Sequence, residues 1–511
     1  MAVAERAVAG RTAQNYESEY RKDTLLGLKI HLPAQALFLA NAVAAVLALA
    51  LAGGFAFFMG FTRVPAIGIF SQNADAFGRV FTGHGVSALI LWPIFFEVAA
   101  LIFTSTILLG ARIWSKKAGW LSFGLMVAGA VLLMVSTLNG SANVGFTAYV
   151  PMIASPFFYL GYVLFATGAL IAVVNFALTL AQARADGLLK GTLPLLTYGA
   201  ATAAILATVA IACGLVALVP TLLWTAGVFP SVDPIFYRTW FWGLGHTLQY
   251  VNVTAMIVAW YALGALTFKA APINEKYTRV AFTLYIFFTV PVLGHHFLVD
   301  PSLSPAVKIF GGSLMGFGLG IPSLMHGLAI LGSIEIAGRK AGATGLFGWL
   351  KKVPWKEPGM AALMVSMSLF AIGGWSGTVG TTLQLNMVSH NNMWVASHLH
   401  GVVVGGTTLA FMGLSYYLVP LVAGRQLFSR KMAQIQPYLY GVGLFIMMMT
   451  MNWAGFLGVP RRTPDISFGG LAPDWNLPMN IMGIGIALAI LGGIFYVLNM
   501  VLTLRHGKKL A

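Results

Sequence analysis

The feature that most constrains the fold of this chain is a succession of long apolar stretches joined by short loops. A helix needs roughly 20 apolar residues to cross a bilayer, and twelve stretches come close to or exceed that length. They cover residues 34–60, 81–109, 119–138, 157–182, 195–226, 236–267, 279–297, 304–335, 360–386, 393–421, 434–458 and 475–504. We therefore predict an all-α integral membrane protein. A single twelve-helix transmembrane domain would span residues 34–504, between an N-terminal segment, 1–33, and a tail, 505–511.

The composition supports this fold and excludes other classes of protein. Charged residues make up 9% of the chain, whereas a soluble domain carries about 25%. With 58% hydrophobic residues, the chain is not a soluble globular protein, a disordered chain or a DNA-binding module, despite its net charge of +16. Its single cysteine, Cys213, excludes a disulfide framework and an iron–sulfur cluster. We expect membrane lipid around the chain and no nucleic-acid partner.

The basic residues predict how the helices are oriented in the membrane. If the N-terminus is cytoplasmic, 24 of the 30 Lys and Arg residues fall on the cytoplasmic side of the predicted helices and six on the outer side. Cytoplasmic loops of membrane proteins carry such an excess of positive charge. The split predicts that both termini are cytoplasmic and that the number of helices is even, because an odd number would scramble the alternation.

Histidines are the main chemical signal in the sequence. Eight of the ten fall in or beside predicted spans, namely His84, His246, His295, His296, His326, His390, His398 and His400. Ionisable residues inside a membrane are costly and are usually functional. A single such histidine is often structural, but eight of them with two close pairs indicate metal binding. Imidazoles without thiolates suit haem iron, copper or zinc.

The spacing of these histidines limits how they share metals. His398 and His400 project about 200° apart on a helix, so they face opposite sides and serve two different cofactors. The adjacent His295 and His296 can converge on one ion with a third ligand from elsewhere, for which His246 is the candidate. Tyr250 follows His246 at i+4, on the same helix face.

Five segments together resemble the catalytic subunit I of the haem–copper oxygen reductases. They are FTGHGVSAL, FWGLGHTLQY, VLGHHFLVDPS, SHNNMWVASHLHG and GVPRRTPD. The resemblance covers essentially the whole chain, and the sequence around His295 and His398 is most similar to that of the B-family oxidases.

The resemblance implies two haems and one copper ion. Their ligands would be His84 and His400 for a low-spin, electron-transferring haem, His398 for a high-spin haem, and His246, His295 and His296 for the copper. Open positions on the last two metals would face each other, as dioxygen or nitric oxide reduction requires.

The resemblance also implies roles for residues beside the metals. Tyr250 is similar to the tyrosine that the family cross-links to its copper-ligand histidine. That tyrosine supplies a proton and an electron for O–O cleavage. Alternatively, Tyr250 is a packing residue. Arg461 and Arg462 resemble the arginine pair that binds haem propionates, since guanidinium groups bind carboxylates bidentately. His390 is similar to a family position near the propionates of the active-site haem.

Protons are expected to come from the cytoplasmic side. Tyr261 lies three helical turns beyond Tyr250 on the same face, and together with Ser323 it resembles the single proton path of the B-family. His326 stands where that family usually has threonine, so it either relays protons or changes the path. Glu97 is the one acidic residue well inside a span. It is either a proton carrier or a hydrogen-bonded structural acid.

The segment after His246 departs from the family. Thr247 replaces proline, Leu248 leaves no A-family glutamate, and Gln249 places an amide where valine is usual. Retention of Tyr250 favours reduction of dioxygen to water by a respiratory terminal oxidase. Polar groups near the metals favour the alternative, a nitric oxide reductase, whose conventional members bind non-haem iron in place of copper. Gln249, Asn252 and His326 are such groups.

The resemblance finally predicts partners and a location. The chain lacks the cysteines of a dinuclear copper site, so we expect a subunit II that carries electrons through dinuclear copper or a cytochrome. Cytochrome c or a similar protein would be the donor, and the location would be a bacterial or archaeal plasma membrane. A more remote alternative, a polytopic secondary transporter, predicts neither paired histidines nor bound haem, and the sequence has no visible inverted repeat.

Overall fold

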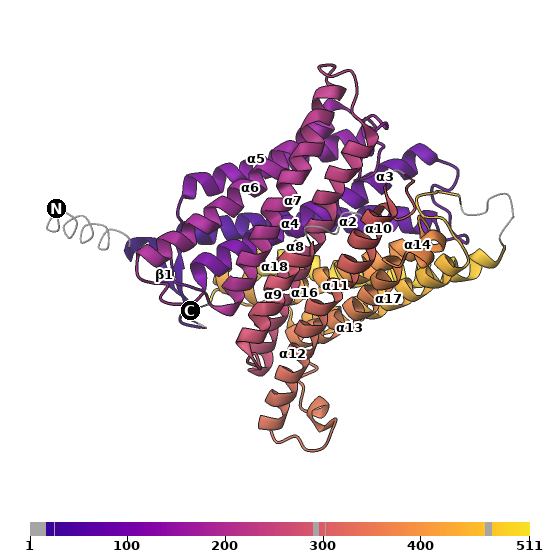
Figure 1. The fold of residues 1–511 in the computed structure, drawn as a ribbon. Coiled ribbons are helices and arrows are strands. Elements are labelled where there is room, and N and C mark those ends of the chain that lie inside the picture. The colour runs from indigo at the N-terminus through magenta and orange to yellow at the C-terminus, as the bar shows by residue number, and fades with distance from the viewer. Residues whose placement is uncertain (1–16, 25, 290–295, 302, 466–472, 511) are drawn as a thin grey trace.

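The described part of the chain is a bundle of long helices. The structure, a computed structural model, describes residues 17–24, 26–289, 296–301, 303–465 and 473–510. Within these ranges, eleven helices are long and apolar enough to cross a membrane, and they pack side by side in one bundle (Figure 1). The predicted all-α membrane fold is confirmed. The seventh predicted stretch, 279–297, contains α9 (Glu275–Thr289) and continues into residues outside the described ones.

The first half of the chain forms a short hairpin and five of these long helices. Its elements are η1 (Glu17–Glu19), β1 (Tyr20–Lys22), β2 (Lys29–His31), α2 (Leu32–Thr62), α3 (Ala74–Val86), η2 (Ser87–Leu91), α4 (Trp92–Ile102), η3 (Phe103–Ile107), α5 (Lys116–Leu138), α6 (Pro156–Ala185) and α7 (Leu195–Thr225).

The second half continues the bundle with helices that are more often interrupted. Its elements are α8 (Pro234–Phe268), α9, α10 (Pro305–Lys308), η5 (Ile309–Leu314), α11 (Met315–Gly318), α12 (Gly320–Lys340), η6 (Gly348–Lys351), α13 (Pro358–Gly380), α14 (Leu383–Ser389), α15 (Met393–Leu399), η7 (His400–Thr408), α16 (Leu409–Ala423), α17 (Arg430–Phe456), η9 (Pro473–Trp475) and α18 (Asn476–His506).

Local capping residues fix where the helices begin and end. The side chains of Ser115, Asp233 and Ser429 accept hydrogen bonds from backbone N–H groups in the first turns of α5, α8 and α17, which satisfies donors that a helix start leaves open. The predicted helix over 360–386 is wrong at its end. α13 stops at Gly380, and a separate helix, α14, follows after Thr382.

In the described ranges, four π-helical segments interrupt the spans that carry the histidines and their neighbours. η2 begins three residues after His84, and η7 begins at His400; η3 and η5 lie in the second span and in the span of α12. Such segments are frequent at functional sites, and each rotates the residues that follow it relative to a regular helix. The sequence pattern, taken at 3.6 residues per turn, does not reveal them.

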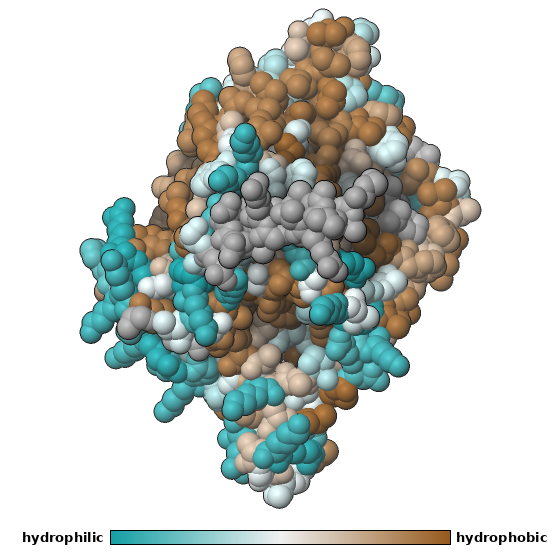
Figure 2. All heavy atoms as spheres, turned by 90° about the vertical axis from the view of Figure 1, so that its left-hand side faces the viewer, coloured by the Kyte–Doolittle hydropathy of each residue, from teal (hydrophilic) through white to brown (hydrophobic). Residues whose placement is uncertain are grey.

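The N- and C-terminal residues that the structure describes lie at one end of the bundle (Figure 1). Strands β1 and β2 pair antiparallel, and Arg21 from this hairpin donates to the backbone carbonyls of Leu421 and Val422 at the end of α16. Leu510 N donates to Gly424 O at the same place. Hydrophilic side chains gather on this end of the molecule (Figure 2). The two described ends of the chain therefore meet on one side of the bundle.

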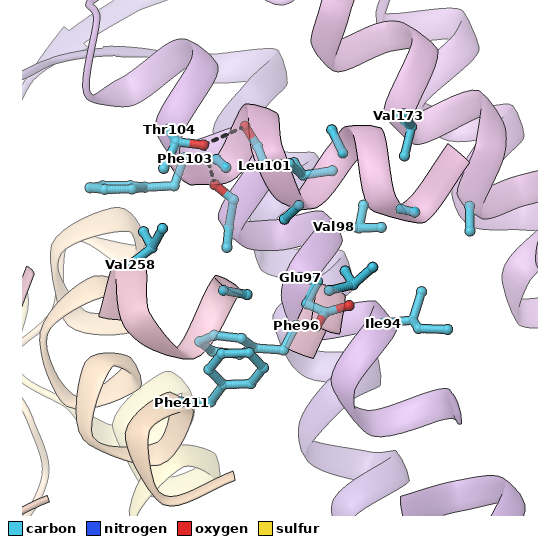
Figure 3. A pocket seen from close by; sticks show the side chains of 18 of the residues that line it. Ile94, Phe96, Glu97, Val98, Leu101, Phe103, Thr104, Val173, Val258 and Phe411 are labelled. Atoms are coloured by element: carbon cyan, nitrogen blue, oxygen red, sulfur yellow. Dashed lines mark hydrogen bonds between the residues drawn. The ribbon is translucent and has the colours of Figure 1, made fainter. Parts of the chain in front are cut away.

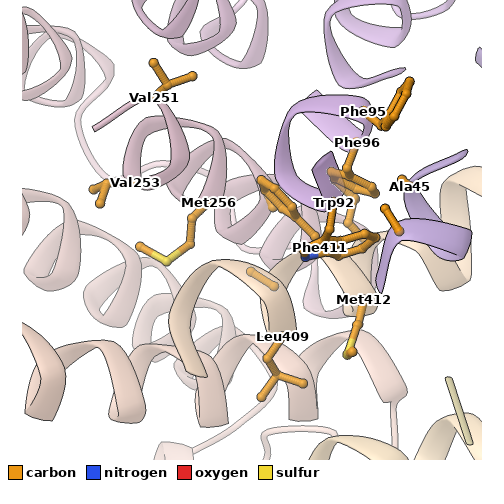
Figure 4. Packing of buried hydrophobic residues seen from close by; sticks show 14 of the residues in the cluster. Ala45, Trp92, Phe95, Phe96, Val251, Val253, Met256, Leu409, Phe411 and Met412 are labelled. Atoms are coloured by element: carbon orange, nitrogen blue, oxygen red, sulfur yellow. The ribbon is translucent and has the colours of Figure 1, made fainter. Parts of the chain in front are cut away.

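Aromatic packing joins the helix that follows His84 to the helix that follows His400. The Phe96 and Phe411 rings stack with centres 4.3 Å apart, and Trp92 Nε1 donates to Thr408 Oγ1 at 3.0 Å (Figure 4). These contacts hold α4 against η7 and α16. The second and tenth predicted spans, far apart in the sequence, therefore lie side by side in the core.

Backbone contact through glycine holds α18 against α17. A Cβ at Gly485 would lie 2.6 Å from Met447 N and 2.7 Å from Gly443 O, whereas a Cβ at Gly493, two turns further along α18, would meet nothing within 4 Å. We predict that Gly485→Ala destabilises the protein by about 1–3 kcal/mol through overpacking, while Gly493→Ala leaves stability unchanged or slightly higher. Thermal unfolding of the two purified variants measures this difference, and equal unfolding temperatures would contradict it.

Candidate metal centres

Three of the predicted ligand histidines share one arrangement of hydrogen bonds. In each, Nδ1 bonds a backbone carbonyl: His84 to Ala52 at 3.1 Å, His398 to Gly373 at 2.8 Å, and His400 to Ala396 at 2.7 Å. A carbonyl oxygen only accepts, so Nδ1 carries the hydrogen and Nε2 keeps its lone pair. This is how metal-binding imidazoles are oriented in proteins.

His84 and His400 face each other across the packed spans of α3 and η7. Their ring centres lie 6.1 Å apart and their planes differ by 12°. Two metal–nitrogen bonds of about 2 Å, together with the imidazole rings themselves, place two ring centres roughly 6 Å apart. The pair therefore fits a single metal with two axial imidazoles, as the sequence predicted for the low-spin haem.

His398 points to the other side of the same helix. Its Nδ1 partner, Gly373, belongs to α13, whereas His400 faces α3. The predicted opposite orientation of His398 and His400 is confirmed. The ring lies so close to Gly377 that a Cβ there would be 2.4 Å from His398 Cε1. Glycine at 377 is therefore what leaves room for this imidazole.

Two of the three predicted copper ligands, His246 on α8 and His296 after α9, come together. His246 Nδ1 and His296 Nε2 lie 3.3 Å apart, a separation that two nitrogens about 2 Å from one ion would have near a tetrahedral angle. The third predicted ligand, His295, lies outside the described residues. Within the described ranges, no group of three His, Cys, Asp or Glu side chains is arranged to hold a metal. Tyr250 lies beside His246, with ring centres 5.2 Å apart.

An aromatic pair that the sequence analysis missed supports His296. Trp242, one turn before His246 on α8, stacks on the His296 ring at 3.6 Å with planes 9° apart. Trp242 Nε1 donates to Tyr149 OH at 2.8 Å. Trp242 could have been found from the sequence because it precedes His246 by four residues, as Tyr250 follows it by four, and residues four apart lie on the same helix face.

The two predicted propionate-binding arginines lie in a loop that is tied to the segment before α15. Asn391, which has a left-handed backbone (φ 61°), accepts a hydrogen bond from Arg461 N with its carbonyl and from Arg461 Nε with its side chain, at 3.2 and 3.0 Å. Burial and the neighbouring charge of Arg462 lower the pKa of Arg461 to about 9. Partial desolvation, and then these two arginines, lower the pKa of His390. Such a crowded positive cluster fits an anionic group.

Hydroxyl and imidazole groups continue from Tyr250 toward the end of the bundle that carries the termini. The Tyr250 and Tyr285 rings lie 5.5 Å apart, and Tyr285 and Ser323 hydroxyls bond at 2.9 Å. Tyr261 OH bonds His326 Nδ1 at 3.2 Å, and the Tyr285 and His326 rings are parallel with centres 5.9 Å apart. The structure therefore brings the four predicted proton-path residues together: Tyr250, Tyr261, Ser323 and His326.

Two members of this chain of groups escaped the sequence analysis. Tyr285 and Thr278 are fully buried on α9, and Thr278 Oγ1 lies 3.5 Å from Tyr261 OH. Their spacing of seven residues, two helical turns, places both on one face of α9. Thr289, four residues further, is buried on the same face. The recurrence of hydroxyl side chains every four or seven residues along α9 is the sequence pattern that could have identified this face.

Comparison with known proteins identifies the family. Residues 36–488 match the family described as cytochrome c and quinol oxidase polypeptide I. This chain belongs to that family, the subunit I superfamily of the haem–copper oxidases. The resemblance noted in the sequence is thereby confirmed.

Individual members of the haem–copper oxidase family match most of the chain. Cytochrome c oxidase subunit 1 of Thermus thermophilus is 30% identical over 437 residues, which cover 84% of this chain and 77% of that protein. A putative cytochrome c oxidase subunit 1-beta of Streptomyces avermitilis is 25% identical over 475 residues, covering 87% and 77%. A chain from a cryo-EM structure of a heme-copper terminal oxidase dimer superposes with a TM-score of 0.87 at 26% identity, covering 93% of this chain and 84% of that one.

One cavity in this haem–copper oxidase fold lies apart from the histidine cluster. It has a volume of about 460 Å³, is lined almost entirely by apolar side chains of α4, α6, α7, α8 and α16, and contains Glu97. The Glu97 carboxyl lies near Ile94 and Val98 of its own helix (Figure 3), and its Oε1 is buried without a hydrogen-bond partner among the described residues. The described contacts favour neither a hydrogen-bonded structural acid nor a member of the polar chain.

We predict that Glu97→Gln and Glu97→Leu both keep turnover within about twofold of the unaltered enzyme, because no hydrogen bond among the described residues joins Glu97 to the polar groups around Tyr261. Glu97→Leu should also raise the free energy of unfolding, since a buried polar atom without a partner costs about 1–3 kcal/mol. Steady-state activity and thermal unfolding measure the two effects. A loss of activity in both variants would show that Glu97 carries protons.

Proposed function

We propose that this chain is the catalytic subunit of a respiratory terminal oxidase that reduces dioxygen to water. The observation that carries the proposal is the set of three imidazoles, His84, His398 and His400, each with Nδ1 bonded to a carbonyl. Two of them are spaced to share one metal, and the third faces the opposite side of its helix. The match to a heme-copper terminal oxidase over 93% of the chain supports the same activity.

The residues fit two haems and one copper ion, which when bound supply the electron transfer and the dioxygen chemistry. His84 and His400 would hold the low-spin haem, and His398 the high-spin haem. His246 and His296, with His295, would hold the copper. Arg461, Arg462 and His390 would bind the haem propionates. The separation of only two residues between His398 and His400 gives electrons a short route between the haems.

Tyr250 is proposed as the proton and electron donor at the dioxygen site. Its ring lies 5.2 Å from that of His246, and it follows His246 at i+4 on α8, the spacing at which the resemblance places the family's cross-link. Protons would reach it from the cytoplasmic face through Tyr261, His326, Ser323 and Tyr285. The bonds that join these groups are 3.2 Å for Tyr261–His326 and 2.9 Å for Ser323–Tyr285.

The proposed setting is a bacterial or archaeal plasma membrane with both termini in the cytoplasm. Of the 30 basic residues, 24 would then lie on the cytoplasmic side, as the positive-inside rule expects. A subunit II with dinuclear copper or a cytochrome would deliver electrons from cytochrome c or a similar donor.

Nitric oxide reduction is the second candidate function, and two buried amides favour it. Asn252 is 1% exposed, and neither its Oδ1 nor its Nδ2 has a hydrogen-bond partner within the described part of the chain; the same holds for Gln249 Oε1. Both side chains lie within two turns of His246 on α8. Amides available to bind water near the metals would help deliver protons to bound nitric oxide.

We predict that His84→Ala and His398→Ala each lower the haem content of the purified protein from two to about one per chain. The first variant should lose the low-spin absorption and the second the high-spin absorption. His326→Thr is the matched control, because it replaces a buried histidine that is not a proposed ligand, and it should keep both haems. An alkaline pyridine haemochrome assay with optical spectra makes the measurement. Unaltered haem content in His84→Ala or His398→Ala would contradict the ligand assignment.

We predict that the purified complex consumes dioxygen faster than nitric oxide when each is offered alone, and that metal analysis finds copper. Gln249→Val should lower any nitric oxide turnover and leave dioxygen turnover within about twofold, because valine is the family's usual residue there. Gas electrodes for the two substrates give the rates. Robust nitric oxide reduction without dioxygen uptake would replace the first proposal with the second.

A further inference from the structure

The proton path described above reaches the surface at the beginning of α9. Thr278 and Tyr261 are buried, with 0% and 5% of their surfaces exposed, and their hydroxyls lie 3.5 Å apart. One turn before Thr278 stands Glu275, whose side chain is 53% exposed. Within a single helical turn, α9 therefore leads from solvent to the hydroxyl pair next to His326.

The Glu275 carboxylate is held in a defined position at this point. Its Oε1 accepts hydrogen bonds from Nε and Nη2 of Arg279, one turn further along α9. The guanidinium is itself fixed, because it also donates to Leu193 O and lies over the Tyr198 ring at 4.8 Å. The carboxylate is thus presented to solvent at the head of the path by a rigid arginine.

In the part of the chain that the structure describes, Glu275 lies among basic and phenolic groups. The titratable or charged groups around Glu275 are Lys276, Tyr277 and Arg279 on α9, Tyr198 on α7, Tyr261 on α8 and His326 on α12, with Lys269 at the end of α8. Among these, Glu275 is the one carboxylate. Residues i and i+3 are neighbours on a helix surface, so a single water molecule can bridge Glu275 and Thr278.

We propose that Glu275 is the group that collects protons for the path to Tyr261. This rests on the proposed proton-consuming function, whether the substrate is dioxygen or nitric oxide. The carboxylate takes a proton from hydronium, which becomes water, and passes it through the bridging water to the Thr278 hydroxyl. Thr278 gives its own proton to Tyr261, and Tyr261 gives one to His326 Nδ1, so Glu275, Thr278 and Tyr261 each end with the protons they began with and His326 holds the proton that was taken up.

The chain offers a matched control on the same face of the bundle. Glu335 on α12 pairs with Arg339 at i+4, as Glu275 pairs with Arg279. Its side chain is 35% exposed, yet it lies nine residues beyond His326, and Ser333 beside it bonds back to the Ala329 carbonyl. Loss of either acid removes one charge and one ion pair, but only Glu275 adjoins the path.

The test uses the purified holo complex and follows proton uptake with a pH-indicator dye after an oxidant pulse to the reduced enzyme. We expect Glu275→Gln and Thr278→Val to slow uptake about tenfold or more, as loss of a proton-transfer group does. Glu335→Gln should stay within twofold of the unaltered complex. Haem absorption should be unchanged in all three, and Glu275→Asp should restore most of the rate.

Two outcomes would overturn the proposal. One is unaltered proton uptake in Glu275→Gln. The other is equal slowing in Glu275→Gln and Glu335→Gln, which would indicate a general effect of surface charge. If Glu275→Gln does not assemble, Thr278→Val decides by the same criterion. Failure of the proposed function would give a different result, because the unaltered complex would then consume neither dioxygen nor nitric oxide and would take up no protons.

Discussion

The site depends on three hydrogen bonds from imidazole Nδ1 to backbone carbonyls. Each bond contributes only about 1 kcal/mol to stability, but it selects the tautomer whose Nε2 can bind a metal. The acceptors at Ala52 and Gly373 belong to α2 and α13, helices packed against those that carry His84 and His398. Helix packing therefore orients the imidazoles without help from the metal. Gly373 can act as the acceptor for His398 because Gly373 and Gly401 let the backbones of α13 and η7 come into contact. A Cβ at Gly401 would lie 2.6 Å from Gly373 Cα.

Helix α8 connects the proposed metal site to the proposed proton path. His246, Tyr250 and Tyr261 follow the helical period along it, so one rigid element fixes both the proposed copper ligand and the groups that would supply its protons. Between them, the Thr254 hydroxyl donates to the Tyr250 carbonyl at 2.5 Å. The path then leaves α8 for α9 and α12 through Thr278 and His326. Sequence-distant hydroxyls thus become neighbours because three helices share one buried face.

The sequence was most informative where chemistry and periodicity coincide. The spacing of the histidines predicted the opposite faces of His398 and His400 and the approach of His246 to His296, and the family resemblance predicted the grouping of Tyr261 with His326. It was least informative where tertiary contacts decide. The π-helical segments, the end of α13 at Gly380 and the hairpin that Arg21 anchors to α16 all depend on partners that local patterns do not encode. Tyr285 was missed because one tyrosine in an apolar helix resembles ordinary core.

Within the described residues, a buried polar atom without a hydrogen-bond partner does not by itself distinguish a proposed proton carrier from a residue outside the proposed path. His326 and Glu97 both have such an atom, His326 Nε2 and Glu97 Oε1, and each costs about 1–3 kcal/mol. At His326 the other nitrogen bonds Tyr261, so the ring has one connected side and one open side, which is the arrangement a relay needs to receive a proton and release it elsewhere. Glu97 lies in an apolar cavity with no described bond to any polar neighbour. An open atom fits a role in proton transfer only when its side chain is also bonded to a donor, and of these two residues His326 meets that condition through Tyr261.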